Sequence, residues 1–325
     1  MQLGMIGLGK MGANMRDRLR RAEHEVIGYD LDEDLTDVAT IEELVQGLQA
    51  PRTVWVMVPH GEPTHQTVAQ LGDLLDEGDL VIEGGNSFYL DDQKHDDHLA
   101  PKGIGYVDCG VSGGIWGLEN GYGLMCGGRD EHVEMAMPIF DALRPEGPRE
   151  EGFVHAGDVG SWHYAKMVHN GIEYGLMHAY GEGFELLLKK DIVKDVTGCF
   201  NAWSRGTVVR SWLLDLLVES LQKNPELNGV DGYTTDSGEG RWTVLEAVEN
   251  EVPMPVLSAA LFARFTSRQD NSPSMQAVAA LRGAFGGHDV RMLDDAEASS
   301  AGPSSGTSAS SGDSGPTSGS GSADH

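Results

Sequence analysis

The stretch Gly7-Leu8-Gly9-Lys10-Met11-Gly12 decides the fold of the first half of the chain. It matches the pattern G-x-G-x-x-G, follows an apolar run at 2–6 and opens a helix-compatible segment at 10–21. In this context the first glycine permits a tight turn, the second lets a pyrophosphate approach the backbone, and the third lets helix and strand pack closely. The sequence therefore predicts a dinucleotide-binding turn, and a purely structural glycine turn is the alternative.

The residue after the next predicted strand, 25–29, indicates which dinucleotide binds. Asp30 lies near the offset of about 20 residues at which an acidic side chain binds the ribose hydroxyls. Leu31 and Asp32 follow it, so no arginine is at hand for a 2′-phosphate. We therefore predict NAD as the cofactor, with NADP disfavoured.

Short apolar runs alternate with helix-compatible segments through the first half of the chain. Strands are expected at 2–6, 25–29, 54–58, 80–82, 105–109 and 123–126, and helices at 10–21, 64–75 and 91–99. This alternation predicts an α/β, Rossmann-like, doubly wound domain over residues 1–157.

The pattern changes beyond residue 157. Residues 159–190 lack proline and carry apolar side chains at helical spacing, which predicts one long helix. Shorter helices are expected at 193–203, 208–222, 241–250, 253–267 and 274–284. We expect an all-helical substrate and oligomerisation domain over 158–292, followed by a disordered, Ser- and Gly-rich acidic tail over 293–325.

The predicted long helix carries a row of polar side chains. Lys166, His169, Asn170, Glu173 and Tyr174 are spaced so that all share one helical face. A lysine beside a cationic cofactor ring has a lowered pKa, which suits a general base, and a glutamate in the same pocket could donate a proton. The alternative is a solvated face with a Lys–Glu pair.

Two glycine-rich loops follow predicted strands, at the edge where open α/β sheets bind ligands. One contains Asn86, and the other contains Ser112, Gly113 and Gly114. Backbone amides and small hydroxyls there could hold a carboxylate, although ordinary turn chemistry is the alternative reading of either loop.

Cations for a phosphate group come from the end of the chain. Arg264, Arg282 and His288 are the candidates, and solvated surface residues are the alternative. His95 and His98 have metal-like spacing, but they stand among aspartates on a helix interpreted as exposed, so no metal site is predicted.

Composition excludes several classes of function. The net charge is −28, from 51 acidic and 23 basic residues spread along the chain, which disfavours nucleic acid and anionic membranes as partners. No apolar run approaches the ~18 residues of a membrane span, and no signal peptide is recognisable. Three scattered cysteines fit a reducing cytoplasm. The acidic surface also suggests a halophilic cytoplasm.

The order of motifs along residues 1–290 resembles that of the 6-phosphogluconate dehydrogenases, within the β-hydroxyacid dehydrogenase superfamily. The motifs are GLGKMG (7–12), EGGNS (83–87), VSGG (111–114), KMVHNGIEY (166–174), GRWT (240–243), FAR (262–264) and FGGH (285–288). The resemblance implies NAD-linked oxidative decarboxylation of 6-phosphogluconate to ribulose 5-phosphate, in the pentose phosphate pathway.

The resemblance also implies roles for single residues. Lys166 would be the general base and Glu173 the later proton donor. The substrate's carboxylate and hydroxyls would be held by Ser112, Gly113, Gly114, His169 and Asn170, with Asn86 near the nicotinamide, and its phosphate by Tyr174, Arg264, Arg282 and His288. It further implies a homo-oligomer, dimer or tetramer, in which the Arg282/His288 segment reaches a neighbouring active site.

The chain departs from the family pattern in length and at one position of the phosphate site. The chain lacks the second helical block of long members, so it resembles the short form. Ser237 stands where long forms place a phosphate-binding lysine. The alternatives are a dehydrogenase for an unphosphorylated acid such as 3-hydroxyisobutyrate, and a non-catalytic dinucleotide sensor.

Overall fold

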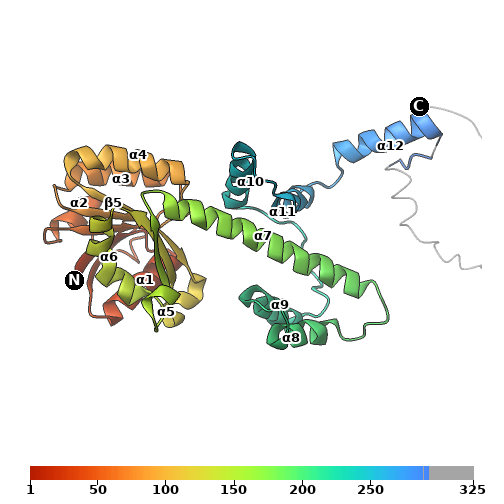
Figure 1. Cartoon of the computed structure of the whole chain (residues 1–325), viewed down its shortest axis with the longest axis horizontal. Coiled ribbons are helices and arrows are strands. Elements are labelled where there is room, and N and C mark those ends of the chain that lie inside the picture. Colours follow the sequence, from red (N-terminus) through yellow and green to blue (C-terminus); the bar gives the residue numbers. More distant parts are fainter. Residues whose placement is uncertain (288, 293–325) are drawn as a thin grey trace, which may run out of the picture. The chain divides into compact units, whose positions relative to one another are not determined.

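A computed structural model describes residues 1–287 and 289–292 (Figure 1). Within it, residues 1–268 form one compact unit, and the described residues from 269 onward belong to a second, which contains helix α12 (Pro273–Gly286). His288 and the predicted tail at 293–325 lie outside the described residues.

A seven-stranded sheet forms the centre of the first half of the chain, in the order β2-β1-β3-β4-β5-β6-β7. The strands are β1 (Gln2–Ile6), β2 (Glu25–Tyr29), β3 (Thr53–Val56), β4 (Leu80–Glu83), β5 (Gly105–Ser112), β6 (Gly123–Gly128) and β7 (Phe153–Gly157). All neighbours are parallel except β5 and β6, which are antiparallel. The predicted Rossmann-like class is confirmed. The sequence did not predict β7, because none of its residues is fully buried and no continuous apolar run marks it.

Helices cover both faces of this sheet (Figure 1). On one face α1 (Lys10–Arg21) and α6 (Asp130–Leu143) close a core around Met15 and Phe140, beside the short α5 (Gly117–Asn120). On the other, α2 (Ile41–Gln46), α3 (Glu62–Leu74) and α4 (Tyr89–Leu99) bury Leu44, Leu71 and Leu99. Single 3-10 turns lie at Ala100–Lys102, Gly114–Trp116 and Arg149–Glu151. Because both faces are covered, the central strands are almost wholly apolar.

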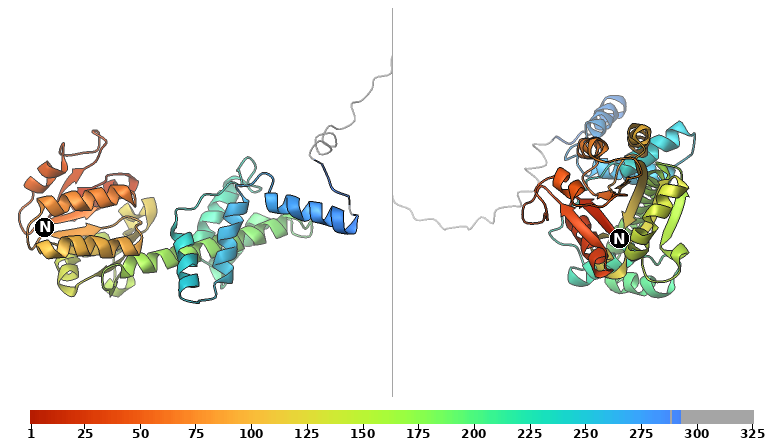
Figure 2. Two further views of the ribbon diagram at one scale, coloured as in Figure 1. Left: turned by 90° about the horizontal axis from the view of Figure 1, so that it is seen from above. Right: turned by 90° about the vertical axis from the view of Figure 1, so that its left-hand side faces the viewer.

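The second half of the chain is helical, as predicted. Helix α7 (Ser161–Leu188) is 28 residues long and is followed by α8 (Val196–Gly206), α9 (Trp212–Lys223), α10 (Glu239–Glu249) and α11 (Pro255–Thr266). Figure 2 shows α7 leaving the sheet and running past α10 and α11. It contacts β5, β6 and β7 and also α10 and α11. In the described part of the chain, no helix has the length and apolar character that crossing a membrane requires.

Candidate active site

The glycine turn between β1 and α1 has the geometry that a pyrophosphate requires. Gly7 has a φ of +93°, a conformation that side chains disfavour. A Cβ on Gly12 would lie 1.9 Å from the carbonyl oxygen of Gly7, whereas a Cβ on Gly9 would meet nothing within 4 Å. The turn is therefore closed toward the protein and open toward a ligand.

A cavity of about 910 Å³ opens at this turn. Its walls include Gly7, Gly9, Lys10, Met11 and Gly12 from the turn, residues 57–60 after β3, residues 84–86 after β4 and Val111. Leu8 does not line it: the side chain is fully buried, and the backbone N–H donates to the Asp30 carboxylate at 2.5 Å. Leu8 therefore takes part through its backbone, by tying the turn to the end of β2.

A second cavity, of about 510 Å³, adjoins Asp30. Its described lining contains four carboxylates, from Asp30, Glu33, Asp37 and Glu43, and no basic side chain. Leu31, where an arginine would serve a 2′-phosphate, is 90% exposed. A further negative charge entering here would be repelled, so the cavity fits a ribose with free hydroxyls.

The first turn of α7 is fastened to the sheet by a buried carboxylate. Asp108 on β5 is fully buried and accepts hydrogen bonds from the backbone N–H groups of Gly160 (2.7 Å), Trp162 (2.9 Å) and His163 (3.1 Å). A carboxylate at this position satisfies free N–H groups and complements the positive end of the helix dipole. Asp108 thereby fixes where α7 begins.

Lys166 lies on the buried side of α7, one turn beyond this cap, and is 8% exposed. Burial lowers the pKa of its ammonium group, and the neighbouring carboxylates of Glu173 and Glu239 oppose that shift. Burial therefore favours the neutral amine, the form in which a lysine can accept a proton. The contribution of Glu239 was not predicted from the sequence.

The polar row on α7 divides into two parts. Asn170 and Tyr174 are buried with Lys166. The His169 and Glu173 side chains are 45% and 36% exposed, and Nδ1 of His169 lies 3.3 Å from the Glu173 carboxylate. The buried part can orient a ligand, while Glu173 remains accessible to exchange a proton.

Tyr174 contacts one arginine and one backbone N–H. The Arg264 guanidinium stacks on the Tyr174 ring, 3.7 Å from its centroid, and donates to the Thr235 carbonyl oxygen at 2.8 Å. The Tyr174 hydroxyl accepts from the backbone N–H of Ser237 at 3.3 Å. Tyr174, Arg264 and Ser237, distant in sequence, therefore meet at one place.

The other predicted site residues are distributed as follows. Asn86 lines the larger cavity. Ser112 ends β5, and Gly113 and Gly114 follow it with φ values of +146° and +55°, a backbone that favours glycine. Arg282 lies on α12, in the second compact unit, and no contact with the site is described for it.

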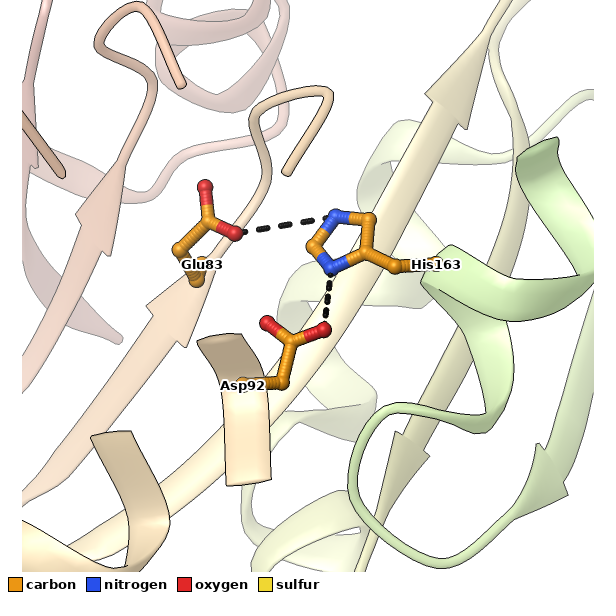
Figure 3. Close-up of side chains that lie close together, drawn as sticks. All are labelled: Glu83, Asp92 and His163. Carbon is orange, nitrogen blue, oxygen red and sulfur yellow. Dashed lines mark hydrogen bonds and ion pairs between the residues drawn. The ribbon is translucent and has the colours of Figure 1, made fainter. Parts of the chain in front are cut away.

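Three buried residues near Lys166 were missed by the sequence analysis. Figure 3 shows His163 between Asp92 and Glu83, with a different ring nitrogen facing each. Nδ1 is 2.7 Å from the Asp92 carboxylate, and Nε2 is 3.6 Å from that of Glu83 and 3.1 Å from the Gly85 carbonyl oxygen. All three side chains are buried. The spacing of His163 to Lys166, three residues on one helix, was the available signal.

The contacts of His163 are those of a protonated imidazole. Nδ1 faces the Asp92 carboxylate, and Nε2 faces the Gly85 carbonyl oxygen and the Glu83 carboxylate, so both ring nitrogens face acceptors. Burial lowers the pKa of His163, but the carboxylates of Asp92 and Glu83 outweigh burial and raise the pKa to about 10. Burial raises the pKa of Asp92, yet the hydrogen bond from Tyr106 at 2.9 Å and the contact with His163 favour its ionised form.

The sequence analysis interpreted the 91–99 helix as exposed, and this prediction is wrong for one face of the helix. Asp92 is fully buried and His95 is 6% exposed. His95 contacts the Tyr106 hydroxyl at 3.2 Å and His65 at 2.8 Å. The many acidic residues of this helix concealed a polar face that packs inward against β5.

Models of known families match both halves of the chain. Residues 2–145 match the "NAD binding domain of 6-phosphogluconate dehydrogenase", and residues 162–283 match "6-phosphogluconate dehydrogenase, C-terminal domain". A relative from Haloferax volcanii, named "6-phosphogluconate dehydrogenase, NAD(+)-dependent, decarboxylating", is 41% identical over 91% of this chain and 100% of its own length. The chain belongs to the 6-phosphogluconate dehydrogenase family. The resemblance predicted from the motifs is confirmed.

Two further members of the 6-phosphogluconate dehydrogenase family show how the chain compares in length. The putative 6-phosphogluconate dehydrogenase YqeC of Bacillus subtilis is 38% identical over 89% of this chain and 98% of its own. The structure of Plasmodium falciparum 6-phosphogluconate dehydrogenase superposes with a TM-score of 0.74 at 26% identity, covering 90% of this chain and 66% of that one. The chain therefore matches the shorter relatives over nearly their whole length and the longer one over only part of its length.

Proposed function

We propose that this family member oxidises and decarboxylates 6-phosphogluconate to ribulose 5-phosphate and CO2, with NAD as the electron acceptor. The observation that carries the proposal is the placement of two features on one helix. A buried lysine with a lowered pKa lies about two turns from Tyr174, on which Arg264 is stacked. One rigid element thus carries a base and part of a phosphate site, and the Haloferax volcanii relative is named for this reaction.

The residues of the glycine turn, with Asp30 and Asn86, would hold the cofactor. Bound NAD supplies a hydride acceptor for carbon 3 of the substrate. Neutral Lys166 takes the proton from the carbon 3 hydroxyl as the hydride leaves, and the site then contains a 3-keto acid. As the bond to the carboxyl carbon breaks and CO2 departs, protonated Lys166 returns its proton to the carbonyl oxygen. Glu173 then protonates carbon 1 of the enediol, which was carbon 2 of the substrate, while neutral Lys166 takes the proton of the adjacent hydroxyl, and the ketone ribulose 5-phosphate results.

The remaining residues would bind and orient the substrate. Ser112, Gly113, Gly114, His169 and Asn170 hold its carboxylate and hydroxyls, and Tyr174, Arg264, Arg282 and His288 hold its phosphate. The stacked Arg264 and Tyr174 support the second assignment. Ser237, at the place of the lysine of long forms, donates its backbone N–H to the Tyr174 hydroxyl and its own hydroxyl to the Glu239 carboxylate, so it would act by positioning Tyr174.

The chain would work as a cytoplasmic homo-oligomer, with Arg282 and His288 entering a neighbouring copy's site. Large apolar side chains on the helices support this: Leu245 and Val248 on α10 are 61% and 70% exposed, and Val256 and Phe262 on α11 are 63% and 56% exposed. Apolar surface of this kind marks protein interfaces. We place the division between the cofactor and helical domains at residues 157/158.

The test is the formation of reduced cofactor with 6-phosphogluconate, comparing NAD and NADP at high salt. Turnover with NAD preferred is the expected result. A Lys166→Ala variant should lose oxidation and still bind NAD, and near-native turnover by it would overturn the base assignment. If the folded protein oxidises 3-hydroxyisobutyrate and not 6-phosphogluconate, the proposed substrate is wrong.

A further inference from the structure

His163 joins three parts of the molecule that approach the site from different directions. The residue lies in the first turn of α7, while Asp92 comes from α4 and Glu83 from the end of β4. The protonated ring has two N–H donors. Nδ1–H donates to the Asp92 carboxylate, and Nε2–H points toward the Gly85 carbonyl oxygen and the Glu83 carboxylate. Both donors of the ring are therefore committed to protein groups.

The contact with Gly85 matters because this residue is held at both ends. Its N–H donates to Oε1 of Glu83 at 2.8 Å, and its carbonyl oxygen accepts a hydrogen bond from Nε2–H of His163 at 3.1 Å. The other carboxylate oxygen of Glu83 is buried, has no hydrogen bond and faces the same ring nitrogen. Gly85 and the adjacent Asn86 line the larger cavity, so this clamp fixes one wall of it.

His163 is also a neighbour of Lys166 on α7. His163 precedes Lys166 by three residues, and side chains at that spacing are neighbours on a helix. A displacement of the 84–87 loop relative to α7 would therefore change the distance between Lys166 and a ligand that contacts the loop.

We propose that His163 is a positioning residue that clamps the 84–87 loop to α7 and so sets the place of the nicotinamide relative to Lys166. This inference rests on the proposed function, because it assigns the loop wall of the cavity to the reacting end of NAD. His163 itself touches neither substrate nor cofactor in this role.

Two substitutions separate the two ends of the ring. His163→Gln can place an amide N–H near Nε2 and keep the Gly85 contact, whereas His163→Asn reaches only the Nδ1 position and keeps the Asp92 contact. We expect His163→Asn to bind NADH roughly tenfold more weakly, because the ligand must then order a loop that has lost one hydrogen bond to a charged donor. It should also show a larger deuterium isotope effect on kcat with 6-phosphogluconate labelled at carbon 3, while KM for the sugar acid changes little. His163→Gln should remain close to the native enzyme in both measurements.

A purely structural role, in which His163 only neutralises Asp92, predicts the opposite order, with Asn better tolerated than Gln. That order, or equal behaviour of the two variants, would overturn the proposal. His95→Gln is the matched control, since His95 is a buried histidine of the same polar cluster without a contact to Gly85 among its described bonds; its isotope effect should be native.

Two safeguards keep the result interpretable. If an unpaired Asp92 prevents folding, the same Gln and Asn comparison in an Asp92→Asn background removes that buried charge. If the native enzyme does not turn over 6-phosphogluconate, the proposed function fails, while NADH affinity still decides whether His163 positions the loop.

Discussion

Replacing Asp108 with asparagine tests how the catalytic helix is fixed to the sheet. Asp108 is fully buried and accepts three backbone N–H groups from the start of α7, at 2.7, 2.9 and 3.1 Å. Asparagine has nearly the same shape but offers one acceptor oxygen. If that oxygen faces Trp162 and His163, the amide NH2 must face the N–H of Gly160, and two donors then oppose each other.

The expected loss follows from these contacts. One hydrogen bond to a charged acceptor is lost, at about 1.5–3 kcal/mol, and the two that remain become bonds to a neutral acceptor. The favourable interaction of the carboxylate with the helix dipole is also lost, up to about 2 kcal/mol in a buried setting. Relief from burying a charge offsets part of this. We therefore expect a net loss of about 2–4 kcal/mol in the free energy of unfolding.

The assay is urea unfolding followed by the circular dichroism of the helices at constant salt, with the loss obtained from the shift in midpoint and the slope. Asp130→Asn is the matched control, because Asp130 also lies in the first turn of a helix, α6, with a side chain that is 98% exposed. It should change stability by less than about 0.5 kcal/mol. An Asp108→Asn protein as stable as this control would refute the reasoning.

Three further predictions concern catalysis, cofactor choice and salt. Glu239→Gln should move the acid limb of the kcat/KM–pH profile to lower pH, because the Glu239 carboxylate raises the pKa of Lys166; an unmoved limb would show that the two groups do not interact. Asp30→Asn combined with Leu31→Arg should shift the NAD/NADP activity ratio toward NADP, and an unchanged ratio would remove Asp30 as the discriminating residue. With a net charge of −28, the protein should gain stability as salt screens repulsion; full stability in dilute buffer would contradict a halophilic origin.

The sequence predicted those features that depend on local pattern. The glycine turn is recognisable because its requirements, a positive φ at Gly7 and close packing at Gly12, are set by residues within one short segment. The long helix and the row from Lys166 to Tyr174 follow from helical periodicity alone. These features need no knowledge of which elements pack together.

Features formed by tertiary packing could not be read in this way. Asp92 and His163 are 71 residues apart, and nothing local indicates that an acidic helix turns one side inward to meet α7. The antiparallel direction of β6 likewise depends on the path of the chain between strands. The approach of Arg264 to Tyr174 required α11 to be placed against α7.

The cap at the start of α7 also bears on how this protein could be recombined with relatives. A crossover at the apparent boundary between the two family models would separate Asp108 from the three amides that satisfy it, unless both parents supply matching backbone. The cofactor half expressed without α7 would retain an ionised carboxylate in its interior with no donors. A breakpoint beyond the first turn of α7 avoids this requirement, because the sheet and the helix that it anchors are then inherited together.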